Sequence, residues 1–242
     1  MLRTYFANHP DSNEEDWISS EVLRHTMANQ QDYGGFIFLI FLAGVIQTAA
    51  NGYQTLAWLL VSMVSLAYLQ WVKKRFHAKY ALLAIEKQLA FEKKYTPFWC
   101  INAVTWGMAG WPFFCDVPDY IRYFVLSVLS VLAYASVFSL SANRKLAVRF
   151  ITVYIGTQVT YGLWVIGVER NFDVPIIFCS HMIGLLIVWF FCMILINRFN
   201  KSFISDCKLN FKNYSLIRSL ERQSEQLEQE KKSVEIANST IK

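Results

Sequence analysis

The sequence predicts an all-α protein: a six-helix transmembrane bundle followed by a cytoplasmic helix that pairs in a parallel coiled coil. The chain has 242 residues, of which 55% are hydrophobic and 17% charged, whereas an average soluble domain is about 25% charged. Six long windows hold most of the apolar residues. The C-terminal segment is polar instead, and repeats an aliphatic residue every seven positions. These observations together predict the fold.

The apolar windows give the spans of the predicted bundle, because about 20 apolar residues are enough to cross a bilayer as a helix. Asn51-Gly52 predicts a tight turn between the first two spans, and Pro97 suits the first turn of the third. Small side chains at Ala103, Gly107, Gly156 and Thr160 predict seams of close helix packing. The windows are residues 34–50, 53–72, 96–115, 120–141, 146–167 and 174–196.

The positive charges orient the predicted bundle. All of the 23 lysines and arginines except Arg122 and Arg170 fall on one side of the spans. Cytoplasmic loops carry such an excess, so this side, with both chain ends, is predicted to be cytoplasmic. The net charge of +5 follows from this rule and from anionic lipid headgroups. We therefore expect membrane lipids as partners and no nucleic-acid binding.

Three regions follow from these boundaries: a cytoplasmic arm at 1–33, a transmembrane domain at 34–197 and a cytoplasmic connector at 198–242. In the arm, Ser12-x-x-Glu15 is a capping-box pattern. It precedes a partly amphipathic helix, which is compatible with a place on the membrane surface, against the bundle or in water. The apolar residues of that helix are Trp17, Ile18, Val22, Leu23 and Met27.

The connector carries a heptad pattern. With Leu220 at position d, Ile217 stands at position a, and the later a positions are polar. Apolar d positions with polar a positions predict a weak coiled coil with a defined register. We expect a parallel homodimer, and the alternative is a single amphipathic helix lying on another partner. The predicted seam comprises Ile217, Leu220, Leu227, Val234 and Ile241.

A small-molecule site is expected inside the bundle, because the predicted outer connections are too short for a separate domain. An ionisable residue within a span is costly and marks a candidate functional position, and His181 is the clearest one. Aromatic residues with a few polar groups are the usual lining of a pocket. The alternative is that the aromatics form an interfacial belt and that His181 only joins helices. The other candidates are Trp106, Gln158, Tyr161, Trp164, Trp111, Gln47 and Arg122.

The sequence indicates no metal site, cofactor or catalytic residue. Its five cysteines include no CxxC pair, and the predicted spans contain one histidine and no carboxylate. Acid/base or metal catalysis would require a cluster of such groups.

The end of the chain resembles a known family. The run Ser-Val-Glu-Ile-Ala-Asn-Ser-Thr-Ile-Lys at 233–242 is similar to the stretch that precedes the phosphoacceptor domain of bacterial sensor histidine kinases, where the pattern is roughly Glu-x-Ala-Asn-x-x-Lys. Lys242 stands one residue later than in that pattern. Residues 220–230 resemble the signalling helix of the same proteins, and the aromatic, Gly-containing segment 98–111 resembles the third span of six-span sensor modules.

This resemblance implies a sensor module in a bacterial inner membrane that perceives a small signal and relays it to a cytoplasmic output domain. A response regulator would then be reached only through that domain, which lies outside this sequence. None of the four histidines stands in a phosphoacceptor motif. The sensor module of a diguanylate cyclase, or a small transporter or channel, are the alternatives.

Overall fold

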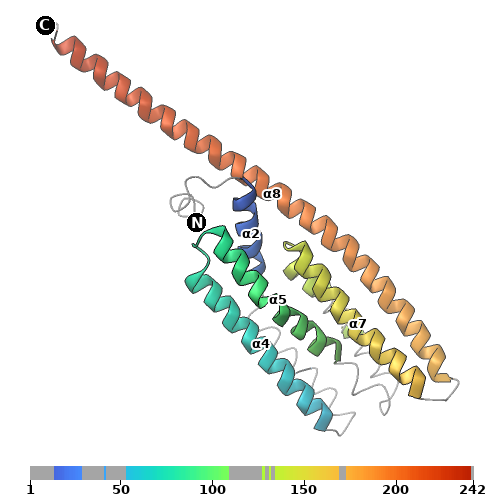
Figure 1. The fold of residues 1–242 in the computed structure, drawn as a ribbon. Helices are drawn as coiled ribbons and strands as arrows, with labels where there is room; N and C mark the ends of the chain where they lie inside the picture. Colours follow the sequence, from blue (N-terminus) through green and yellow to red (C-terminus); the bar gives the residue numbers. More distant parts are fainter. Residues whose placement is uncertain are drawn as a thin grey trace.

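Every regular element in the described part of the chain is a helix, which confirms the predicted all-α class for those residues (Figure 1). The computed structural model describes residues 14–28, 53–108, 134–168 and 173–240, together with residues 41, 127, 128 and 131. Residues 134–140 are helical as well. The helices are α2 (Glu14–Ala28), α4 (Tyr53–Lys79), α5 (Ile85–Gly107), α7 (Arg144–Val168) and α8 (Asp173–Thr240).

The predicted spans are reflected in part. Helices α4, α7 and α8 cover the second, fifth and sixth windows, and α5 covers the first half of the third. The first window except residue 41, and half of the fourth, lie outside the described residues. By length and composition, two described helices qualify as membrane spans, namely Leu56–Lys79 and Met182–Ile236.

Helices α4 and α5 form an antiparallel hairpin that turns at residues 80–84. Near one end of the pair, Ser65 Oγ lies 3.1 Å from Asn102 Oδ1. Near the other end, the rings of Phe76 and Phe91 are 5.4 Å apart. The chain therefore reverses direction at this turn, and the start of α5 lies alongside the end of α4.

Helix α7 runs parallel to α5 and antiparallel to α8. The amide of Asn143 donates to the carboxylate of Glu92 before α7 begins, and Thr157 further along α7 faces Gly107. Against α8, Arg144 Nε donates to Asn197 Oδ1 at 2.7 Å. Trp189 Nε1 donates to Thr152 Oγ1 at 3.2 Å. Because α5 and α7 run in the same direction, the chain between them must return to the side on which α5 begins.

The largest core cluster lies where α4, α5, α7 and the first part of α8 meet, and contains Trp99, Ala103, Phe150 and Ile151. The outward faces of these helices are also apolar. Their exposed large side chains include Leu60, Val64, Leu163, Ile187 and Phe190.

The proline at position 97 stands elsewhere in its helix than the sequence indicates. Helix α5 begins at Ile85, so Pro97 lies in its interior and not in its first turn. A proline costs one backbone hydrogen bond, but the turns before it are held by packing. Phe91 and Tyr95, both nearly fully buried, join the cluster that also includes Phe76 of α4.

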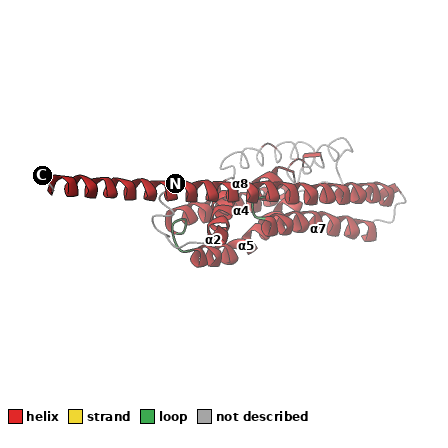
Figure 2. Ribbon diagram, turned by 90° about the horizontal axis from the view of Figure 1, so that it is seen from above, coloured by secondary structure: helices red, strands yellow, loops and turns green. Residues whose placement is uncertain are grey.

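Helix α8 is continuous over 68 residues (Figure 2). At 1.5 Å per residue it is about 100 Å long, and its C-terminal part extends beyond the other helices. The boundary at 197/198 therefore falls inside an unbroken helix.

One of the predicted small-residue seams is present between the described helices, at Gly107. Ala103 and Gly107 lie against α7, and a Cβ atom at Gly107 would come within 2.8 Å of Thr157 Cβ and of the Tyr154 carbonyl oxygen. Gly156 has nothing within 4 Å of its Cβ position, and Thr160 is exposed. Among the described residues nothing packs on Gly156 and Thr160, so the seam at these two positions stays a prediction.

We expect Gly107→Ala to destabilise the bundle, because its Cβ would force α5 and α7 apart. Overpacking of this kind costs about 1–3 kcal/mol, more than the roughly 1 kcal/mol of helix propensity that alanine returns. The measurement is the thermal unfolding midpoint of the purified chain in detergent. Gly156→Ala is the matched control and should leave the midpoint unchanged or raise it. A midpoint for Gly107→Ala equal to or above that of the control would contradict the close approach.

Candidate functional site

Four of the predicted pocket residues have described side chains: Trp106, Gln158, Tyr161 and Trp164. The backbone of His181 belongs to α8, but its side chain lies outside the described part of the chain. Also outside the described residues are Gln47, Trp111 and Arg122.

Trp106 is buried in a polar clamp between α4 and α5. Its indole Nε1–H donates to Asn102 Oδ1 at 3.0 Å, and the same oxygen accepts from Ser65 Oγ. Beside it, Trp58 Nε1–H donates to the carbonyl of Thr105 at 2.7 Å. The indole proton of Trp106 is therefore engaged within α5, by the same amide oxygen that joins α5 to Ser65 of α4.

Gln158 is buried in α7, with 5% of its surface exposed. Neither its Oε1 nor its Nε2 meets hydrogen-bond geometry with a described residue. The phenol of Tyr154, one turn earlier on the same buried face, contacts this amide side chain to side chain, although not with full hydrogen-bond geometry. A buried amide without a hydrogen bond costs about 1–3 kcal/mol, so this position suits a polar ligand atom.

Tyr161 and Trp164 form a stacked pair with ring centroids 5.9 Å apart. Tyr161 is buried, whereas Trp164 is 59% exposed and faces outward, as a residue of an interfacial belt does. The antiparallel register set by Trp189 with Thr152 brings residue 181 of α8 level with residue 160 of α7. Gln158 and Tyr161 therefore lie close to the level of position 181.

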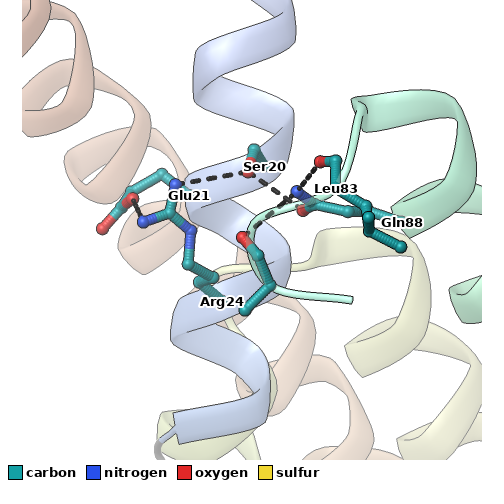
Figure 3. A network of polar contacts seen from close by, with 6 residues as sticks. Ser20, Glu21, Arg24, Leu83 and Gln88 are labelled. Atoms are coloured by element: carbon teal, nitrogen blue, oxygen red, sulfur yellow. Dashed lines mark hydrogen bonds and ion pairs between the residues drawn. The ribbon is translucent and has the colours of Figure 1, made fainter. Parts of the chain in front are cut away.

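A second candidate site, missed by the sequence reasoning, lies where α2 meets the bundle (Figure 3). Gln88 of α5 is fully buried, and its Oε1 accepts a hydrogen bond from Ser20 Oγ of α2 at 2.9 Å. Its Nε2 donates to the carbonyl of Leu83 at 2.7 Å. Arg24 pairs with Glu21 at 3.5 Å and donates to Ser20 Oγ at 3.4 Å. These bonds fix α2 to the turn between α4 and α5.

Apolar contacts hold α2 on two sides. Leu23 and Met27, each 1% exposed, pack into the cluster with Phe76 and Phe91 from the hairpin. On its other side, Trp17 packs against Phe211 of α8 with ring centroids 5.7 Å apart and ring planes tilted by 44°. Helix α2 therefore lies against the bundle, which is one of the three placements compatible with its sequence, and it joins the α4–α5 hairpin to the middle of α8.

Burial also shifts the acid–base behaviour of this junction. It lowers the pKa of His25, which lies 4.5 Å from the ring of Phe203, and the charge of Glu21 partly opposes that shift. The folded junction therefore favours the neutral imidazole. The stability that His25 contributes to the packing of α2 is fully present above the unfolded pKa of about 6.5, and it is lost as the pH falls through the lower pKa of the folded state. Burial, with smaller contributions from Glu21 and Asp206, raises the pKa of the Cys207 thiol to about 11.

Comparison of the chain with protein-family models, with curated proteins and with solved structures gives no match. The function must therefore be inferred from the residues of the chain. Of these two candidate sites, the α2 junction is the one described with all of its side chains, and its chemistry is that of a mechanical link between helices.

Replacing Trp17 with alanine should release α2 from α8 and expose Cys207, which is 4% exposed. Labelling of a buried thiol follows the local opening equilibrium. Deleting a buried tryptophan side chain costs about 3–5 kcal/mol, and a loss of only about 1.4 kcal/mol would raise the labelling rate about tenfold.

The measurement is the rate of maleimide labelling at pH 7.5 in a chain that keeps Cys207 as its sole cysteine. Trp71→Ala is the control, because Trp71 lies on α4 and is 45% exposed. Equal rates in both variants would show that α2 does not cover α8.

Proposed function

We propose that the chain is the sensing and connecting region of a dimeric membrane receptor, which perceives a small signal in its bundle and relays it to a cytoplasmic output domain. The observation that carries this proposal is the continuity of α8. One helix packs on α7, contacts α2 and then extends beyond the bundle. The resemblance of the C-terminal residues favours a histidine kinase as the output domain, with a diguanylate cyclase as the alternative.

The apolar outer surface supports a place in the membrane. In the two helices that qualify as spans, only 22% and 17% of the most apolar window is buried inside the protein. The core helix of a soluble protein would hide most of such a window. Apolar helix faces exposed over the length of a whole window are rare on a water-soluble monomer, whereas lipid acyl chains can cover them.

The helix directions support six spans. Helices α4 and α8 run one way and α5 and α7 the other, so the predicted fourth span supplies the required return between α5 and α7. With the predicted first span before α4, both chain ends lie on the strongly basic side. Such a side is cytoplasmic, and the bacterial inner membrane is the location that fits it.

The intramembrane pocket remains part of the proposal. Gln158 offers an amide with no hydrogen bond to a described residue, Tyr161 lies one turn further along, and position 181 is at the same level. A histidine there would add a second polar contact. These groups suit a small amphipathic signal, autoinducer-like in chemistry, that enters from the lipid or from outside.

The tail supports a homodimer. In a single chain the predicted seam is open to solvent, because Leu220 is 63% exposed and Leu227 is 66% exposed. Ile217 and Val234 are also exposed, and Ile241 lies outside the described residues. A second copy of the same helix, leaving the same face of the membrane, would cover this seam in parallel register. A transporter or channel would need no such seam, and substrate uptake or conductance in liposomes would favour that alternative.

Membrane topology is tested by single cysteines and an impermeant thiol reagent in intact cells. Cysteines in place of Asn51 and Asp173 should react from outside, because the basic loops lie inside. Cysteines in place of Lys79 and Glu228 should react only after permeabilisation. Labelling of Lys79→Cys or Glu228→Cys in intact cells would overturn the six-span arrangement.

Relay through the tail is tested by disulfide cross-linking in a chain without its native cysteines. Leu220→Cys and Leu227→Cys should cross-link to their own copies, because d positions face each other in a parallel coiled coil. Gln229→Cys is the control outside the seam, and efficient cross-linking there with none at Leu220 would contradict the register.

The same assay reads the coupling between bundle and tail. If α2 transmits the state of the bundle to α8, then Trp17→Ala should change the cross-linking yield of Leu220→Cys. Trp71→Ala should leave that yield unchanged. A yield that is indifferent to Trp17→Ala would show that the tail dimerises independently of the junction, and the proposed route of signalling would fail.

A further inference from the structure

We propose that a cavity between α5 and α7 binds a phosphate group, and that its occupant is the headgroup of an anionic phospholipid. The cavity has a volume of about 170 Å³, far above the roughly 10–15 Å³ that one water molecule requires. It is lined by Glu92, Lys93, Thr96, Lys145, Leu146 and Arg149, among others. The phosphate chemistry follows from these residues, whereas the lipid source rests on the membrane placement proposed above.

The charges around the cavity are unbalanced. Lys93 comes from α5, and Lys145 and Arg149 come from α7. The one carboxylate in the lining, Glu92, accepts a hydrogen bond from the Asn143 amide. Three converging cations therefore face a single carboxylate that already has a neutral partner. Such a site attracts an anion with several acceptor oxygens, and arginine and lysine are the usual ligands of phosphate.

The backbone adds to this preference. Lys145 lies in the first turn of α7, and the N-terminus of a 25-residue helix carries a partial positive charge that favours anions. The hydroxyl of Thr96 donates to the Glu92 carbonyl at 2.8 Å, so it offers the ligand an acceptor only. Binding is thus expected to depend on the three cationic side chains and not on the hydroxyl.

The height of the cavity favours a lipid over a soluble phosphate. Thr96 and Leu146 are the residues at which the third and fifth predicted spans begin on the cytoplasmic side. A site at this level faces the headgroups of the inner leaflet, whose anionic lipids bind to basic pockets between transmembrane helices. Leu146 and Leu89 give the cavity apolar walls, against which a glycerol backbone can pack.

The test is native mass spectrometry of the full chain in neutral detergent, titrated with phosphatidylglycerol, phosphatidylcholine or inorganic phosphate. The wild type should retain phosphatidylglycerol in preference to phosphatidylcholine. The variant Lys93→Gln/Lys145→Gln/Arg149→Gln should bind phosphatidylglycerol at least about tenfold more weakly, because each cation near a headgroup contributes on the order of 1 kcal/mol. Lys74→Gln/Lys79→Gln/Lys87→Gln, the same charge change at positions that do not line the cavity, should bind as the wild type does.

The remaining outcomes also decide the proposal. Equal losses in the two triple variants, or equal binding of both lipids, would overturn the cavity as a phosphate site. Displacement of phosphatidylglycerol by millimolar inorganic phosphate would overturn the lipid as occupant and leave the phosphate chemistry intact. If the triple variant does not fold, Arg149→Gln alone decides, since Arg149 is exposed, and unchanged binding in it would overturn the proposal. Cysteine labelling tests membrane placement separately, so a failure of topology is distinguishable from a failure of the site.

Discussion

The close approach of α5 and α7 is the contact on which the other helices depend. At Gly107 the two backbones come so near that even a methyl group would collide with Thr157 and with the Tyr154 carbonyl. Helix α4 packs on α5 through Trp58, Ser65 and Asn102, and α8 packs on α7. Each outer helix is thus placed by its contact with one member of the central pair.

Helix α2 links the two outer parts of this arrangement. Without it, the α4–α5 hairpin and the middle of α8 would be connected only through the bundle. The Ser20–Gln88 hydrogen bond lies on the side of the hairpin, and the Trp17–Phe211 ring contact lies on the side of α8. A change in the hairpin can therefore reach α8 by a route outside the proposed membrane region. The half-buried His25 adds a dependence on pH to the same route.

The sequence predicts some features of this structure well and others poorly, for identifiable reasons. The helical class and the positions of α4, α7 and the first part of α8 follow from long apolar windows, which are a local property. The start of α5 does not, because Phe91 and Tyr95 are held by Phe76 and Leu23, residues remote in the chain. The apolar pattern of α2 is visible in the sequence, but the surface on which it lies is not.

The candidate pocket shows the same limit. Spacing along a helix gives depth, and the register of α7 with α8 puts Gln158 and Tyr161 close to the level of position 181. Spacing does not give the contacts that each side chain makes. Trp164 is exposed, and the indole of Trp106 donates to Asn102, one turn earlier on its own helix. A list of aromatics at one depth therefore cannot distinguish residues that line a pocket from residues engaged in packing.

Because α8 is unbroken, its C-terminal part can move as one rigid rod that pivots near its contact with α2. From Tyr214, near the last contact with α2, to Thr240 at the end of the helix, the distance is roughly 40 Å at 1.5 Å per residue. A tilt of about 10° at this pivot would move the far end by roughly 7 Å over that length. In the proposed dimer, two such helices joined along the seam could not swing freely, so a small tilt at the junction would become twist or separation between them. Over this length α8 would convert a small tilt into a larger displacement with a smaller force. A smaller force can rearrange a weak coiled coil more easily than a strong one.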